Sequence, residues 1–154
     1  MAFHLSALER IGPFDVALGA GSPCMGGEDT LAFTELLCGG GTVVYQPTAV
    51  TRHFHRRSVE ELRTQMLGYG VGLTAFYLSL VLDHPRCVPA LIKLLPKAYR
   101  DMFGREGLQS SGLPPDFPAD LLRVKRRGMF IGPMSYLRAR LAAGRSERKA
   151  KVVR

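Results

Sequence analysis

The longest uncharged stretch of the chain constrains its fold most. Nineteen residues separate Arg63 from Asp83, and apolar side chains recur on one helical face from position 62 to position 80. Ser58 and Glu61 form a capping box just before this stretch. Three glycines and several hydroxyl groups make it a marginal bilayer span. The sequence therefore predicts a long helix that is buried or lies at an interface.

Glycines within this helix predict a close contact. Gly68 and Gly72 lie one turn apart, which allows another backbone to approach.

The chain has 154 residues, 46% of them hydrophobic and 22% charged, which is enough for one domain with a modest core.

The cysteines and the N-terminal residues bear on location. Cys24, Cys38 and Cys87 are widely spaced and form no CxxC, which argues against a zinc or redox site and favours free thiols. The N-terminal residues do not have the pattern of a signal peptide. We therefore expect a cytoplasmic protein, either free or at the cytoplasmic face of the membrane.

The positive charge is concentrated near the C-terminal end. Residues 119–154 hold eleven Lys and Arg against two acids, whereas residues 1–118 hold ten against eleven. Such a basic segment is suited to anionic lipid or phosphate, or it is a solvated end. We expect two short basic helices near 121–127 and 135–143, followed by ten unstructured residues.

The first half of the chain predicts alternating short elements. A capping box from Ser6 to Glu9 predicts a helix that Gly12 ends. Glycines make 19–27 a loop, and a helix follows from Glu28 to the glycines at 39–41. Two extended segments follow, a strand at 42–45 and a second piece at 49–55, and a further helix is expected over 86–100.

Three motifs with chemical potential follow one another closely. They are the helix that begins at Ser6, the loop ending in Gly-Gly-Glu-Asp at 26–29, and the His-Phe-His-Arg-Arg segment at 53–57. Each alone has an ordinary interpretation, since acids cap helices and paired histidines are common on surfaces. On a strand, however, His53 and His55 point to the same face and could converge on one ion or phosphate.

Together these motifs resemble the second half of family-2 glycosyltransferases. The matching pieces are MAFHLSALERIGPFD, GGEDTLAFTELL, VVYQPTAVTRHFHRR, GYGVGLTAF and RGMFIGPMSYLRAR. The resemblance implies an α/β protein, the acceptor-side part of a GT-A (Rossmann-like) fold, rich in helix and with a helical basic C-terminal extension. It divides the chain into a catalytic part at 1–57, apolar helices at 58–103, and a loop with a basic helical tail at 104–154.

The resemblance also implies an activity and a catalytic base. Such enzymes move a sugar from a nucleotide sugar to an acceptor hydroxyl, here with inversion expected. Asp29 is then the general base, Glu28 its neighbour or an acceptor-binding residue, and Gly26 and Gly27 the acceptor loop. A fixed carboxylate can take the proton of the attacking hydroxyl. The resemblance implies an acceptor that carries a hydroxyl group, with a lipid-linked molecule as one candidate.

The resemblance further implies a site for the leaving diphosphate. His53 is the first choice, and His55 the reserve, as ligand of a Mg²⁺ or Mn²⁺ ion that would neutralise charge on that group. Arg56 and Arg57 are expected to bind the diphosphate, because guanidinium groups pair with phosphate in a bidentate manner.

The sequence departs from the family pattern on the nucleotide side. It contains no βαβ opening and no DxD motif, and Met1 matches the interior of a family motif. We therefore expect a fragment that is inactive alone, with the nucleotide-binding half supplied elsewhere.

The alternatives are proteins of other classes. One is a small basic protein that binds membranes or nucleic acid without catalysis. Nucleic acid is the less expected of these two partners, because the sequence has no recognised nucleic-acid-binding motif. Another is an independent metal-dependent hydrolase that uses Glu28, Asp29, His53 and His55, which ranks lowest because no recognisable ligand spacing supports it.

Overall fold

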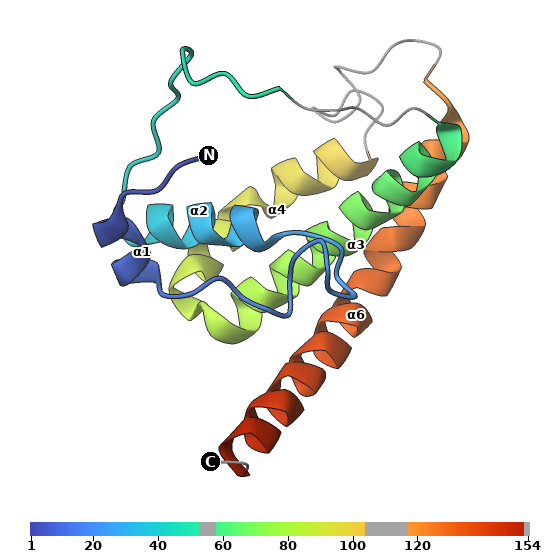
Figure 1. Cartoon of the computed structure of the whole chain (residues 1–154). Coiled ribbons are helices and arrows are strands. Elements are labelled where there is room, and N and C mark those ends of the chain that lie inside the picture. The colour runs from blue at the N-terminus through green and yellow to red at the C-terminus, as the bar shows by residue number, and fades with distance from the viewer. Residues whose placement is uncertain (53–57, 104–116, 153–154) are drawn as a thin grey trace.

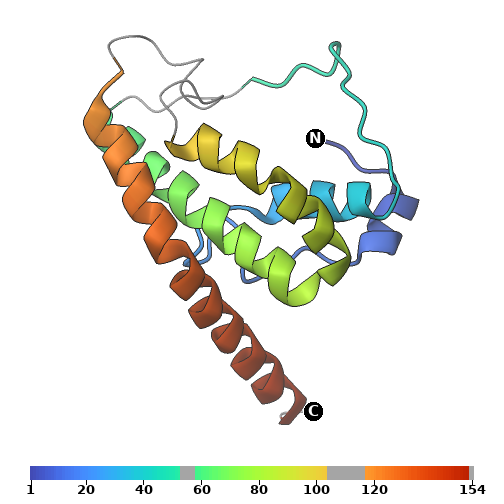
Figure 2. The same ribbon diagram turned by 180° about the vertical axis from the view of Figure 1, so that it is seen from behind.

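The computed structural model describes residues 1–52, 58–103 and 117–152, and its regular elements are helices (Figure 1). In chain order these are α1 (Leu5–Ile11), α2 (Glu28–Cys38), α3 (Val59–Asp83), the 3-10 helix η1 (Pro85–Cys87), α4 (Val88–Phe103) and α6 (Ala119–Val152). α3 and α6 lie side by side, and α2 and α4 lie on the other side of α3 (Figures 1 and 2). The C-terminal part of α6 projects away from the other helices.

The predicted α/β architecture is wrong for the described part of the chain, which contains no strand. Residues 42–46 and 49–52 have no regular secondary structure, and Val44, Tyr45 and Val50 are 78%, 88% and 80% exposed. A strand requires a neighbour to complete its backbone hydrogen bonds. Because no described segment pairs with these residues, the Rossmann-like sheet does not form there. Residues 53–55 of the predicted second strand lie outside the described residues.

Local signals placed most helix ends correctly. The Ser58 side chain accepts a hydrogen bond of 3.2 Å from the Glu61 amide, which confirms Ser58 as the N-cap of α3. α2 begins at Glu28 and ends before Gly39, as predicted. α4, preceded by η1, matches the helix predicted over 86–100.

The first helix differs from its prediction at one end. Gly12, with φ of 79°, ends α1 as expected. The capping box at Ser6 is wrong, because α1 begins at Leu5 and its N-cap is His4. The Ser6 hydroxyl bonds the His4 ring at Nδ1 over 2.9 Å instead of capping the helix.

Glycines allow α3 and α6 to pack with their backbones in contact. A methyl group on Gly70 would lie 2.0 Å from the carbonyl oxygen of Lys125, and one on Gly128 would lie 2.3 Å from that of Leu67. Gly132 makes an equally close approach to α3. These distances leave room for a hydrogen atom only, so the three glycines set the separation of the two helices.

The other side of α3 meets the loop before α2. A methyl group on Gly72 would lie 3.0 Å from the carbonyl oxygen of Gly26, and one on Gly68 would lie 3.3 Å from Cβ of Met25. The predicted close approach of another backbone is therefore confirmed at Gly72, whereas Gly68 meets the Met25 side chain. α3 has packed neighbours on both sides and forms the centre of the fold.

α6 is one continuous helix, so the prediction of two short helices with an unstructured end is wrong. Pro133 lies inside it and cannot donate a hydrogen bond to the carbonyl of Met129. The Thr74 hydroxyl of α3 donates to that carbonyl instead, over 2.9 Å. Gly132 provides the space, since a methyl group there would lie 2.1 Å from the Thr74 hydroxyl oxygen. A contact from the neighbouring helix therefore satisfies the backbone at the proline.

Replacing Thr74 with valine tests this contact. The change keeps the shape of the side chain but leaves the Met129 carbonyl without its donor, and we expect unfolding free energy to fall by about 1–3 kcal/mol. Urea unfolding followed by circular dichroism measures the loss. The control is Thr64→Val, because the exposed Thr64 hydroxyl bonds only within α3. An equal loss in both variants would contradict the role of Thr74.

The hydrophobic core lies where α3, α6 and the loop of residues 15–25 meet α2 and η1. α3 is the described helix that is long and apolar enough to cross a membrane, and half of its most apolar window is buried within the protein. The buried cluster consists of Ala17, Leu18, Cys24, Leu31, Ala75, Phe76, Leu80, Cys87, Tyr136 and Ala139.

Candidate functional site

The loop before α2 has an unusual backbone. Met25, Gly26 and Gly27 have φ values of 62°, 149° and 110°, and Gly27 is the N-cap of α2. Glycine adopts such angles at little cost. Because this loop packs against Gly72 of α3, it fixes where α2 begins and where the side chains of its first turn lie.

A cleft of about 480 Å³ opens at this loop, and we name it the Asp29 cleft. It brings together all four residues of the predicted acceptor loop and acidic pair, Gly26, Gly27, Glu28 and Asp29. α3 and α6 provide the remaining walls. The lining residues are Met25, Gly26, Gly27, Glu28, Asp29, Thr30, Gly68, Tyr69, Gly72, Leu73, Phe76 and Lys125.

Thr30 binds one carboxylate oxygen of Asp29, and the other oxygen has no described donor. Its Oδ1 accepts hydrogen bonds from the amide and the hydroxyl of Thr30, at 2.7 and 3.4 Å. No described residue donates to Oδ2, and the side chain is half-buried. Asp29 can therefore accept a hydrogen bond, and then a proton, from a hydroxyl group in the cleft.

The Glu28 side chain extends toward Gly19. Its carboxyl carbon lies 3.6 Å from the position a methyl group on Gly19 would occupy. It also lines a small neighbouring cavity together with Asp15 and Glu35. Of the two predicted acids, Asp29 is therefore the better placed to act as a base.

Tyr69 and Lys125 complete the cleft from α3 and α6. The Tyr69 hydroxyl accepts a hydrogen bond of 2.8 Å from Gln65, and the side chain is 55% exposed. Burial lowers the pKa of Lys125. Sequence reasoning missed Lys125, which lies in a basic run about a hundred residues after the acidic pair. It reaches the cleft because α6 packs on α3.

The predicted diphosphate and metal ligands all belong to the segment 53–57. His53, His55, Arg56 and Arg57 lie outside the described residues. The residues that the structure does describe include no group of three potential metal ligands. In the Asp29 cleft the acidic donors are two carboxylates, which do not make a metal site by themselves.

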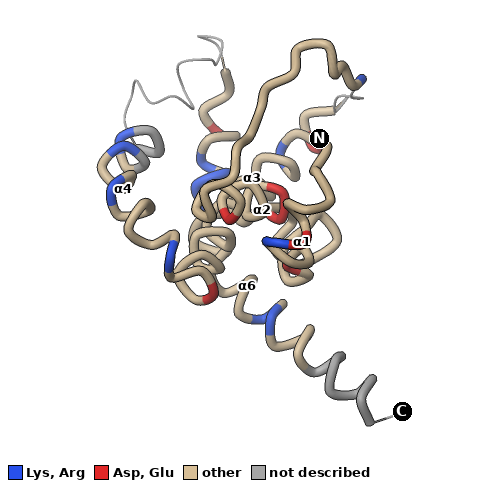
Figure 3. The backbone as a smooth tube through the Cα atoms, turned by 90° about the vertical axis from the view of Figure 1, so that its left-hand side faces the viewer, with Lys and Arg blue, Asp and Glu red and all other residues tan. Residues whose placement is uncertain are grey.

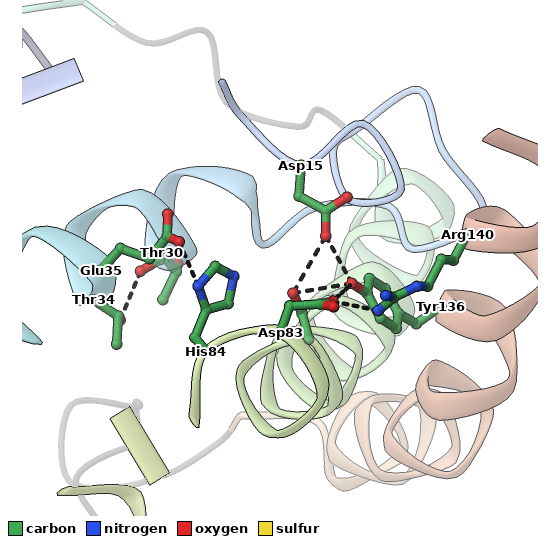
Figure 4. Close-up of polar contacts among 9 residues, drawn as sticks. Asp15, Thr30, Thr34, Glu35, Asp83, His84, Tyr136 and Arg140 are labelled. Carbon is green, nitrogen blue, oxygen red and sulfur yellow. Dashed lines mark hydrogen bonds and ion pairs between the residues drawn. The ribbon is translucent and has the colours of Figure 1, made fainter. Parts of the chain in front are cut away.

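A second polar cluster fastens the N-terminal loop to α3 and α6 (Figure 4). The buried Tyr136 hydroxyl lies 2.9 Å from Asp15, 3.1 Å from Ser79 and 3.0 Å from Asp83. Arg140 pairs with Asp83. Asp15 also accepts from the amide of residue 17 over 2.8 Å. None of these residues lines the Asp29 cleft, but their contacts position the loop that leads to it.

Replacing Tyr136 with phenylalanine removes the central hydroxyl of this cluster. Ser79 is fully buried, and it and two carboxylates would lose their shared partner. We expect the unfolding free energy to fall by about 1–3 kcal/mol in urea melts. Tyr45→Phe is the control, because the side chain of Tyr45 is 88% exposed. A Tyr136→Phe protein as stable as that control would contradict the assigned role.

A short contact between a histidine and a buried carboxyl group joins α2 to the residue that caps the end of α3. His84 Nδ1 lies 2.6 Å from Oε1 of Glu35, which is 7% exposed (Figure 4). Burial raises the pKa of Glu35, and the nearby His84 and Arg86 oppose that rise. The pair helps to hold α2, and with it the first turn that carries Asp29, against α3.

Comparison with protein-family models, with curated proteins and with solved structures finds no match to this chain.

Proposed function

We propose that this chain supplies the acceptor side of a sugar-transfer site, with Asp29 as the general base. One observation carries the proposal. The residues that resemble the acceptor loop and acidic pair of family-2 glycosyltransferases line one open cleft, in which Asp29 keeps an oxygen without a described partner.

The chemistry follows from that carboxylate. An acceptor hydroxyl oxygen attacks the anomeric carbon of a nucleotide sugar, and a new C–O bond forms on the face opposite the leaving group. The bond to the nucleotide diphosphate breaks and its electron pair leaves with the diphosphate. The hydroxyl proton passes to Oδ2 of Asp29. A weak base suffices, because the oxygen becomes acidic as its new bond forms.

Other residues of the cleft would orient the acceptor. Lys125 offers ammonium hydrogens to acceptor oxygens, and the half-exposed ring of Tyr69 offers a flat apolar surface. His53 and the expected Mg²⁺ or Mn²⁺ ion remain predictions from the sequence.

The nucleotide side requires residues beyond this cleft. The sequence has neither a DxD motif nor a βαβ phosphate-binding unit. We therefore expect no transfer from the purified chain by itself, and we expect activity where the missing half is present, at the cytoplasmic face of the membrane.

A transfer assay in cells of the natural source tests the function. Membranes and extract are prepared from cells with the gene intact, deleted, and restored on a plasmid, and are incubated with radiolabelled UDP-, GDP- and dTDP-sugars. We expect incorporation from one donor to be lost on deletion and regained on restoration. Unchanged incorporation from every donor would contradict the proposal and favour a binding protein without catalysis.

A further inference from the structure

An apolar groove lies beside the Asp29 cleft, between α2, α3 and α4, and we name it the α4 groove. Its volume is about 500 Å³, within the range of pockets that hold small organic ligands. The lining residues are Thr30, Thr34, Cys38, Phe76, Tyr77, Leu80, Cys87, Ala90, Leu91, Leu94, Leu95 and Tyr99.

The walls of the α4 groove suit a hydrocarbon. None of the lining residues is acidic or basic at neutral pH. The Thr34 hydroxyl donates to the Thr30 carbonyl over 2.8 Å, so it is engaged within α2. Burial raises the pKa of Cys87 to about 12, which keeps that thiol uncharged. A polar ligand would therefore find few partners here, whereas an alkyl chain would lose apolar surface to water.

The outer edge of the groove is formed by an amphipathic helix. Leu94, Leu95 and Tyr99 of α4 line the groove and are still 55%, 53% and 70% exposed. Lys93 and Lys97 lie elsewhere around the same helix, and Figure 3 shows basic residues along α4. An exposed apolar face beside lysines is the pattern of helices that contact anionic lipid surfaces.

The α4 groove adjoins the Asp29 cleft. Thr30 and Phe76 line both cavities, and Asp29 immediately precedes Thr30 at the start of α2. A ligand in the groove that extends past Thr30 and Phe76 therefore reaches the cleft. Such a ligand would be apolar along most of its length and polar at one end.

We propose that the acceptor is a membrane lipid whose hydrocarbon chain occupies the α4 groove while its hydroxyl-bearing end reaches Asp29. This inference rests on the proposed function and names the substrate class for the same site. Sugar transfer would then occur at the membrane surface, where α4 draws the chain of the lipid out of the bilayer.

Photolabelling tests the groove without any transfer reaction. The purified full chain is mixed with vesicles of phosphatidylcholine and anionic phosphatidylglycerol that contain hexadecanol with a diazirine in mid-chain, and the labelled peptides are mapped by mass spectrometry after irradiation. We expect the label on the groove-lining parts of α3 and α4. Label distributed over the exposed surface, or no label, would overturn the inference.

Two variants of α4 sharpen the test. Leu94 and Ile92 are similarly exposed, at 55% and 58%, but Leu94 lines the groove whereas Ile92 does not. Leu94→Gln places an amide in the groove, which costs about 1 kcal/mol or more, so labelling should fall about fivefold or more. Ile92→Gln should leave labelling unchanged. Equal losses in both variants would indicate general surface binding and contradict a specific groove.

The labelling and transfer experiments together distinguish a failure of the lipid inference from a failure of the proposed function. If hexadecanol labels the groove but transfer does not depend on Asp29, the proposed function fails and the hydrocarbon site remains. If transfer depends on Asp29, water-soluble glycosides serve as acceptors and the groove is unlabelled, the lipid inference alone fails. Sedimentation of the unlabelled chain as a dimer that Leu94→Gln dissociates would also overturn it, because a second copy would then fill the groove.

Discussion

Asp29→Asn is expected to lower sugar transfer by about 10²–10⁴-fold, the usual contribution of a general base. Asparagine keeps the shape of the side chain, and its oxygen can still accept the hydrogen bonds that Thr30 donates. It cannot take a proton from the acceptor. The measurement is the initial rate of labelled sugar incorporation by membranes from cells in which the genomic copy carries the substitution.

The control for this prediction is another neutralised acid. Glu9 is exposed on α1 and lines none of the cavities described above, so Glu9→Gln should transfer sugar at the wild-type rate. The two proteins should also have the same midpoint of thermal unfolding. A loss of less than about tenfold in Asp29→Asn would be too small for a general base and would contradict the assignment.

Gly128→Ala and Gly132→Ala are each expected to destabilise the fold by about 1–3 kcal/mol, because the added methyl group overpacks the α3–α6 contact. The new methyl groups would meet backbone carbonyls of α3 at 2.3 Å, and a backbone cannot move aside as a flexible side chain does. In an open helix the same substitution stabilises by about 1 kcal/mol. The change in unfolding free energy, measured in urea, therefore has opposite signs for a glycine in the α3–α6 contact and a glycine in an open helix.

Gly144 provides the matched comparison within the same helix. A methyl group on Gly144 would meet nothing within 4 Å, so Gly144→Ala should raise the unfolding free energy by up to about 1 kcal/mol. If Gly128→Ala were as stabilising as Gly144→Ala, the close packing of α3 on α6 would be wrong. A larger loss in the double variant at 128 and 132 is also expected.

Signals that act over one or two turns could be read from the sequence. The N-cap at Ser58, the end of α1 at Gly12 and the start of α2 at Glu28 depend on residues within a few positions of each helix end. The spacing of Gly68 and Gly72 also predicted a close backbone contact, which Gly72 makes, although it did not say which segment would approach.

Features that depend on distant segments could not be predicted. A run of β-branched and aromatic residues at 42–45 has strand propensity, but no described segment pairs with it. α6 continues through Pro133 because Thr74, from another helix, bonds the freed carbonyl. Asp15 and Tyr136 meet across 121 positions, and Lys125 reaches the cleft through the same helix packing. In each case tertiary contacts override or complete the local preference.

Chemical rescue of Asp29→Ala by formate tests most directly whether the Asp29 carboxylate carries the proton. Alanine leaves space in an open cleft of about 480 Å³, which a small carboxylate can enter. Formate should raise transfer by membranes carrying Asp29→Ala in proportion to its concentration, and it should leave wild type and Asp29→Asn unchanged. Wild-type transfer by Asp29→Ala without formate, or no rescue of a folded Asp29→Ala protein, would contradict the role of Asp29 as the base.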